Sequence, residues 1–144
     1  MAVSPLLERY GMTREAARAA LARGRAAGDR LLVAAAPGGP PVGLAWIIPS
    51  RILTRAAYLR LLLVDERRQR AGIGAALLRA AEAVARGVAN HLVLLVTADS
   101  AYARRFYARH GYRHVGDLPG LARAGLDEAL YWKTLRPHRE RIRV

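Results

Sequence analysis

A charged turn followed by two closely spaced glycines is the segment of this 144-residue chain whose residue types best suit chemistry. An apolar run over residues 59–64 ends at this turn. The chain then passes through Gln69, Gly72 and Gly74 into an Ala- and Leu-rich helical pattern. Glycine lets a ligand approach the backbone closely, and a helix start exposes unpaired N–H groups that carry partial positive charge. The segment therefore predicts a cradle for an anion, most often a phosphate or pyrophosphate.

Two familiar glycine-rich loops fit this segment poorly. A dinucleotide-binding fingerprint needs a third small residue at the position of Leu77. A nucleotide P-loop needs Gly-Lys followed by Ser or Thr, whereas Ala75 follows Gly74 here. The spacing Gln69-x-x-Gly72-x-Gly74 after an apolar strand instead resembles the coenzyme A pyrophosphate loop of the GNAT family of N-acetyltransferases.

A second segment with the same resemblance follows the next predicted strand, the short apolar run over residues 92–96. Residues 100–112 are similar to the Asn-x-x-Ala-x-x-Phe-Tyr-x-x-x-Gly-Phe segment of the GNAT family. The residues in register are Ala103, Phe106, Tyr107, Gly111 and the aromatic Tyr112, while Ser100 replaces the usual asparagine. Two motifs in the family's order give a resemblance that covers roughly residues 30–135.

Helices and strands that must position these motifs can be read from caps, breakers and apolar periodicity. Helices are predicted over residues 4–11, with Ser4 as cap and Pro5 in the first turn, and over 13–27, 73–88 and 100–110. Strands are predicted over residues 31–36, 42–48, 58–64, 92–96, 112–118 and 128–135, and the first two form a hairpin. No strand is predicted before Ser4. The GNAT resemblance implies an α/β (α+β) fold with a mixed, mostly antiparallel central sheet flanked by helices, in which a splayed parallel strand pair holds the cofactor.

Composition and charge agree with one compact enzyme domain over residues 1–144, with a flexible basic tail over 136–144. The net charge is +13, from 24 basic and 11 acidic residues. All basic residues except Lys133 are arginines spread over the chain, a pattern that does not favour a dedicated nucleic-acid patch. Absence of cysteine excludes disulfides and thiol catalysis. No membrane span or signal peptide is recognised, so we expect a cytoplasmic protein, monomeric or homodimeric.

The resemblance implies acetyl-CoA as co-substrate and no metal. It assigns cofactor contacts to Leu62, Leu63, Val64, Gln69, Arg70, Ala71, Gly72, Ile73, Gly74, Ala75 and Ser100. Backbone groups of residues 62–64 would pair with the pantetheine arm, and those of 70–75 would hold the pyrophosphate. The alternative for the glycines is a tight strand–helix turn that needs them for packing. Arg67 and Arg68 would meet the 3′-phosphate of coenzyme A or form a solvated turn.

Tyr107 is the residue that the resemblance places at the coenzyme A sulfur, as general acid for the departing thiolate. The alternative is a buried tyrosine that packs beside Phe106. Ser100 would contact the pantetheine or cap the helix. A general base is not identified from the sequence, and Asp99, His110 or a bound water stay open. Gly111 ends the helix before His114, so a histidine metal pair is not predicted.

The acceptor is expected to be an amine, of a small molecule, a peptide N-terminus or a protein lysine, which reacts directly in a ternary complex because no cysteine nucleophile exists. It would lie between the segment over residues 6–12 and a loop over 116–126. Two other functions stay open: a basic nucleic-acid-associated module, and a non-catalytic acyl-CoA-binding protein.

Overall fold

The structure, a computed structural model, describes residues 5–53 and 55–136. The predicted cap Ser4 and the predicted tail beyond Arg136 lie outside the described residues. The helices are α1 (Pro5–Arg9), α2 (Arg14–Ala26), η1 (Glu66–Arg68, a 3-10 turn), α3 (Ile73–Arg86) and α4 (Ala101–Arg109). The strands are β1 (Arg30–Ala35), β2 (Pro41–Ile52), β3 (Ala56–Val64), β4 (His91–Thr97), β5 (Arg113–Arg123) and β6 (Leu126–Thr134). None of these helices is long and apolar enough to cross a membrane.

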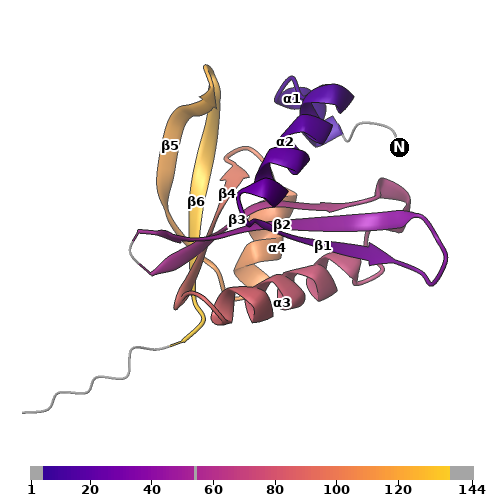
Figure 1. Cartoon of the computed structure of the whole chain (residues 1–144). Helices are drawn as coiled ribbons and strands as arrows, with labels where there is room; N and C mark the ends of the chain where they lie inside the picture. Colours follow the sequence, from indigo (N-terminus) through magenta and orange to yellow (C-terminus); the bar gives the residue numbers. More distant parts are fainter. Residues whose placement is uncertain (1–4, 54, 137–144) are drawn as a thin grey trace, which may run out of the picture.

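The six strands form one sheet in the order β1-β2-β3-β4-β6-β5. Neighbouring strands run antiparallel except β3 and β4, which are parallel and joined through α3. Helices α1 and α2 cover one face of the sheet, and α3 and α4 cover the other (Figure 1). This is the mixed, mostly antiparallel sheet with one parallel pair that the resemblance implied, so the predicted fold class is confirmed.

The parallel pair comes apart partway along its length. Pairing between β3 and β4 runs from Ala56 opposite His91 to Leu59 opposite Leu94. Beyond that point the end of β3 pairs only with β2, and the end of β4 pairs only with β6. The two halves of the sheet therefore diverge, as Figure 1 shows. A β-bulge marks the start of the gap, because the register between β2 and β3 skips Arg60.

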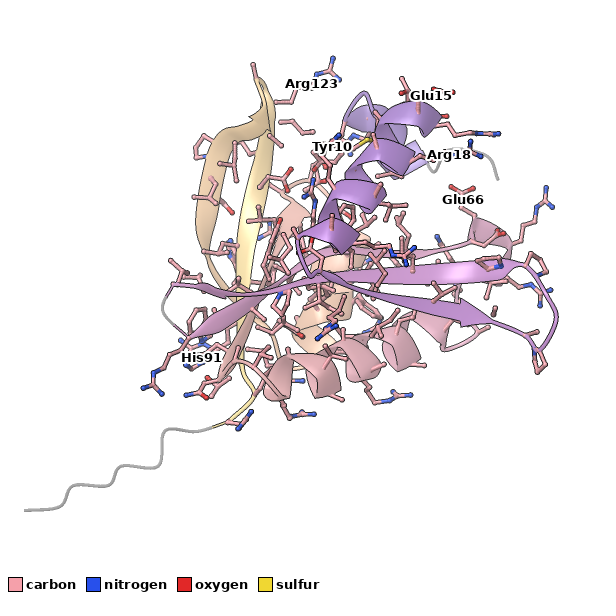
Figure 2. The ribbon with its side chains drawn as sticks, viewed as in Figure 1. Tyr10, Glu15, Arg18, Glu66, His91 and Arg123 are labelled. Atoms are coloured by element: carbon pink, nitrogen blue, oxygen red, sulfur yellow. The ribbon has the colours of Figure 1, made fainter. Side chains whose placement is uncertain are left out.

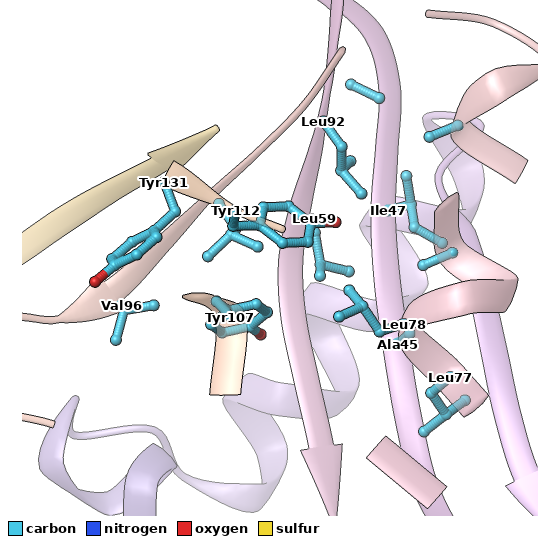
Figure 3. Close-up of a cluster of buried hydrophobic side chains, with 14 of the residues drawn as sticks. Ala45, Ile47, Leu59, Leu77, Leu78, Leu92, Val96, Tyr107, Tyr112 and Tyr131 are labelled. Atoms are coloured by element: carbon cyan, nitrogen blue, oxygen red, sulfur yellow. The ribbon is translucent and has the colours of Figure 1, made fainter. Parts of the chain in front are cut away.

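The main core lies between the sheet and the helices α3 and α4. The helical spacing of Leu77, Leu78, Ala81 and Ala85 on α3 gives a buried face toward the sheet. A Cβ added to Gly43 on β2 would lie 2.8 Å from the Leu77 Cδ1 atom, so the glycine allows α3 to pack directly on the strand. Tyr107, Tyr112 and Tyr131 gather at one end of this core (Figure 3).

Most predicted boundaries differ from the observed ones by one or two residues, and the ends of β2 and β5 differ by more. Strand β2 continues to Ile52, four residues beyond its predicted end. Strand β5 runs to Arg123, so most of the predicted loop over residues 116–126 is a strand paired with β6. Glycine and proline in this segment hid the strand, and a register irregularity between Leu118 and Arg123 accommodates them. Helix α3 ends at Arg86 because Gly87 follows, which leaves Val88 exposed.

Candidate active site

The segment between β3 and α3 presents a run of free backbone donors. Gly72 is the N-cap of α3 with φ at 78°, and Arg70 also has a positive φ of 67°. The first hydrogen bond of the helix runs from the Ala76 N–H to the Gly72 carbonyl. In the described part of the chain, the six N–H groups from Arg70 to Ala75 donate no hydrogen bond outside the helix, and no side chain caps α3. Donors of this kind at a helix start favour an anion.

This cradle meets both the end of β3 and the second motif. A Cβ added to Gly74 would lie 3.7 Å from the Val64 Cγ2 atom and 3.6 Å from the Phe106 ring of α4. These are ordinary van der Waals distances, so packing against the protein does not require glycine at position 74. Gly72 differs, because its left-handed conformation disfavours any side chain. The fold thus joins the two sequence motifs at the open end of the sheet gap.

Leu62, Leu63 and Val64 lie on the side of β3 that borders the gap. They pair with Ala45, Leu44 and Gly43 of β2, and their other edge has no strand partner among the described residues. The next residue, Asp65, is also bound to β2, because its N–H donates to the Val42 carbonyl at 2.7 Å. An unpaired strand edge can accept an extended chain through backbone hydrogen bonds.

Tyr107 lies on the buried face of α4 with 9% of its surface exposed. Its ring makes edge contacts with Phe106 at a centroid distance of 5.1 Å and with Tyr112 at 5.5 Å. Burial raises the pKa of the Tyr107 phenol, which keeps it protonated near neutral pH. Among the side chains that the structure describes, none hydrogen-bonds to this hydroxyl, so the proton is not committed to a structural partner.

Three other candidates from the sequence have defined local roles. The Ser100 hydroxyl accepts a hydrogen bond from the Ala103 N–H at 3.4 Å, so capping of α4 is observed. Asp99 is exposed and forms an ion pair with Arg9 at 2.9 Å, and the Arg9 guanidinium lowers the pKa of its carboxyl. His110 Nδ1 lies 2.8 Å from the Phe106 carbonyl oxygen. Arg67 and Arg68 are exposed on η1, and Gln69 follows them at the entrance to the cradle.

A polar cluster that the sequence did not reveal lies on the opposite face of the sheet, below α1. The Tyr10 hydroxyl hydrogen-bonds to Thr97 Oγ1 at 2.8 Å and donates to Glu128 Oε1. Thr97 and Glu128 lie opposite each other on β4 and β6, and both are buried. Tyr10 is labelled between α1 and these strands in Figure 2. No local pattern marks Glu128, because only the pairing of β4 with β6 and the docking of α1 bring the three side chains together.

A cleft of about 390 Å³ adjoins this cluster and is lined by Arg9, Arg123, Ala124, Gly125 and Leu126. The Arg123 guanidinium donates to the Arg9 carbonyl at 2.9 Å, so the β5–β6 hairpin contacts α1 (Figure 2). The cleft lies between α1 and the β5–β6 hairpin, where the sequence had led us to expect a loop over residues 116–126, and its use by an acceptor stays a prediction. Among the described residues, no group of three His, Asp or Glu side chains could hold a metal ion.

Comparison with known proteins identifies the family. A family model described as "Acetyltransferase (GNAT) domain" matches residues 10–127, and the chain therefore belongs to the GNAT family. Together with the split sheet, this membership defines an acyltransferase. No protein with a curated description matches the chain significantly.

Solved structures that resemble this chain include further acetyltransferases. A protein from Desulfovibrio desulfuricans that is assigned to the GNAT acetyltransferases is 26% identical, with a TM-score of 0.73 over 93% of this chain and 96% of that chain. Ard1 from Thermoplasma volcanium is 29% identical, with a TM-score of 0.58 over 67% and 64% of the two chains. Nourseothricin acetyltransferase is 27% identical, with a TM-score of 0.68 over 74% and 65%.

Two more distant proteins share the fold and were solved with the cofactor. An aminoglycoside 6′-N-acetyltransferase bound to coenzyme A is 16% identical, with a TM-score of 0.73. A GNAT acetyltransferase from Elizabethkingia anophelis bound to acetyl-CoA is 17% identical, with a TM-score of 0.68. The predicted use of acetyl-CoA agrees with these complexes.

Proposed function

We propose that this protein is an N-acetyltransferase that moves the acetyl group of acetyl-CoA to an amine by direct transfer in a ternary complex. The observation that carries the proposal is the row of free N–H groups from Arg70 to Ala75 at the open end of the split between β3 and β4. A diphosphate needs such a row of donors, and the gap beside it suits an extended chain.

Coenzyme A would enter with its pyrophosphate against the N–H groups of Arg70, Ala71, Gly72, Ile73, Gly74 and Ala75. Its pantetheine arm would then run along the free edge of β3 and hydrogen-bond to backbone groups of Leu62, Leu63 and Val64, while Gln69 and Ser100 contact the cofactor from either side. The positive end of the α3 macrodipole adds affinity for the diphosphate. An N–H group at the start of the gap would polarise the thioester oxygen.

In the transfer step, the neutral amine nitrogen attacks the thioester carbonyl carbon and the carbon–sulfur bond breaks. Tyr107 donates its phenolic proton to the departing coenzyme A thiolate. The raised pKa of this phenol supports the role, because the proton is present at neutral pH. The amine enters as an ammonium ion at neutral pH, so its proton must pass to a base before the attack.

The acceptor would reach the thioester through the cleft between α1 and the β5–β6 hairpin, on the sheet face opposite α3. Relatives named above act on nourseothricin and on an aminoglycoside, and a ribosomal-protein-alanine N-acetyltransferase from Brucella melitensis shares the fold at 23% identity. Both small-molecule amines and protein or peptide amines therefore belong in a substrate screen. A cytoplasmic location and a monomeric or homodimeric state stay predictions.

The test is calorimetric titration of acetyl-CoA into the wild type and into Gly74→Glu, followed by measurement of thiol release in the presence of amines. A Cβ atom fits at position 74 by the distances above, and a glutamate there would place a negative charge at the cradle. Gly74→Ala is the matched control, because it adds a Cβ without charge. We expect saturable binding in the wild type and the control and its loss in Gly74→Glu. Binding without amine-dependent thiol release would instead support a non-catalytic acyl-CoA-binding protein.

A further inference from the structure

Glu128 is a buried carboxylate that forms no ion pair among the described residues. Only 4% of its surface is exposed, and it lies on β6 within a chain of net charge +13. Among the side chains that the structure describes, no arginine, lysine or histidine forms an ion pair with it. Its recorded partner is the Tyr10 hydroxyl, a neutral donor. Burial of a charged group is costly unless a counter-charge or strong hydrogen bonds compensate.

Among the described residues, Glu82 on α3 is the other buried carboxylate, and its surroundings differ from those of Glu128. It is 5% exposed, and Lys133 Nζ donates to it at 2.8 Å. The Arg86 guanidinium lies 3.6 Å from its second oxygen, and the Tyr112 hydroxyl donates to it at 3.1 Å. Two cations thus neutralise Glu82, which is a structural ion cluster. Glu128 has no such ion pair among the described residues, and Arg9, the cation that acts on it electrostatically, is already paired with Asp99. A cation from outside the chain could therefore still pair with the Glu128 carboxylate.

Glu128 lies on the strand pair that borders the gap between β3 and β4. Its partner across the sheet, Thr97, is three residues beyond Leu94, the last position at which β4 pairs with β3. At the rise of a strand this places the pair roughly 10 Å along the gap. Tyr58 lies one residue before Leu59, the last residue of β3 that pairs with β4. It interacts electrostatically with Glu128, and burial raises its pKa. Leu126, two residues before Glu128, lines the acceptor cleft.

We propose that Glu128 receives the acceptor amine as an ammonium ion and takes its proton, directly or through one water, before the amine attacks the thioester. The inference rests on the proposed acetyl transfer. One N–H bond of the ammonium breaks and its proton passes to a Glu128 carboxylate oxygen, and the freed nitrogen lone pair forms the new bond to the acetyl carbon. Tyr10 and Thr97 act as positioning residues, which hold the carboxylate toward the gap.

The charged and titratable groups around Glu128 are compatible with this role. Arg9, the last residue of α1, interacts electrostatically with Glu128 but is ion-paired with Asp99. Tyr10 directly follows α1, and Tyr58 comes from β3. Burial and the hydrogen bond to Glu128 raise the pKa of Tyr10, so this phenol stays a proton donor to the carboxylate. Asp99 is a less suitable base for the acceptor ammonium ion, because it is exposed and already paired with Arg9. The primary amine of the acceptor supplies the missing cation.

The decisive variant is Glu128→Gln, which keeps the size of the side chain and an oxygen that accepts from Tyr10. Thiol release from acetyl-CoA is measured against pH with an aminoglycoside, an alanine-initiated hexapeptide and spermidine, and with water as the acceptor if no amine reacts. We expect kcat/KM to fall about 100-fold or more and the acidic limb of the pH profile to lose one unit of slope. Affinity for acetyl-CoA and the melting temperature should stay at wild-type values.

Two further variants separate a base from a structural anchor. Glu128→Asp keeps the carboxylate and should restore the acidic limb at a reduced rate. Glu82→Gln removes the other buried carboxylate and should lower the melting temperature while leaving the pH profile unchanged. Thiol release in Glu128→Gln with wild-type rate and pH profile would overturn the inference alone. A wild type that binds acetyl-CoA but releases no thiol to any acceptor would refute the proposed transfer, and this inference with it.

Discussion

Replacement of Tyr107 by phenylalanine separates catalysis from stability at the proposed acid. The ring contacts to Phe106 and Tyr112, at 5.1 Å and 5.5 Å, do not involve the hydroxyl and survive the change. No described side chain hydrogen-bonds to the hydroxyl, so its removal leaves no partner unsatisfied. Because a structural hydrogen bond would be worth about 1 kcal/mol, we expect the free energy of unfolding to change by less than that.

The effect on the reaction should be far larger. Loss of a positioned general acid typically slows the step about 100-fold to 10,000-fold. We expect kcat to fall by at least about 100-fold, while the dissociation constant of acetyl-CoA stays within about threefold of the wild type, because the cradle and the β3 edge are untouched. The rate would be followed by thiol release, the affinity by calorimetry, and stability by urea unfolding.

Two results would refute this reasoning. A loss of about 2 kcal/mol or more in stability would show that the hydroxyl has a structural partner. An unchanged kcat with bound acetyl-CoA would show that another group, or water, protonates the thiolate. Phe106→Leu is the control, because it alters the neighbouring ring at the cradle without removing a proton donor, and it should weaken acetyl-CoA binding more than it slows the transfer.

The remaining predictions concern backbone conformation, buried charge and pH. Gly72→Ala should lower the unfolding free energy by about 1 kcal/mol because φ is 78°, whereas Gly74→Ala should leave it equal or higher, and urea unfolding of both variants compares the two signs. Lys133→Met should cost about 3 kcal/mol because Glu82 keeps only Arg86 as a counter-ion, and the double variant with Glu82→Leu should recover most of it in a double-mutant cycle. Arg9 lowers the pKa of Asp99 from 3.8, so their pairing stabilises the fold above about pH 4 and is lost as the pH falls further. Asp99→Asn should therefore lower the melting temperature slightly at pH 7 and not at pH 2, and an equal effect at both would contradict the pairing.

Local sequence determined the cradle and the second motif. A row of free N–H groups requires only a helix start without a capping side chain. Gly72 and Gly74 mark this helix start in the sequence. Likewise Gly111, with φ at 84°, ends α4 where expected, and Thr13 caps α2 through the Ala16 N–H. The helix end at Gly111 and the cap at Thr13 are short-range effects of single residue types, so they can be predicted without the rest of the fold.

Strand lengths were harder to predict from the sequence. Residues 116–123 contain Gly116, Pro119 and Gly120, which disfavour strands in isolation. The segment still pairs with β6 at residues 116–118 and at Arg123, and Pro119 and Gly120 lie in the register irregularity between these two parts. No local pattern marks the partner of His91, which stacks on Trp132 of β6 at a centroid distance of 4.4 Å. In both cases a neighbouring strand supplies the partner, and strand preference depends on such neighbours more than on the residue itself.

The sequence by itself determined the family, the helix start with its free N–H groups and the position of Tyr107 on α4, because each depends on residues close together in the chain. Only the tertiary structure decided that the Glu128 carboxylate is buried against Tyr10. Tyr10 and Glu128 are 118 positions apart, and α1 and β6 bring them into contact on the sheet face opposite the main core. A buried charge without a counter-ion is a property of its surroundings, and those surroundings exist only after the strands have paired and α1 has docked.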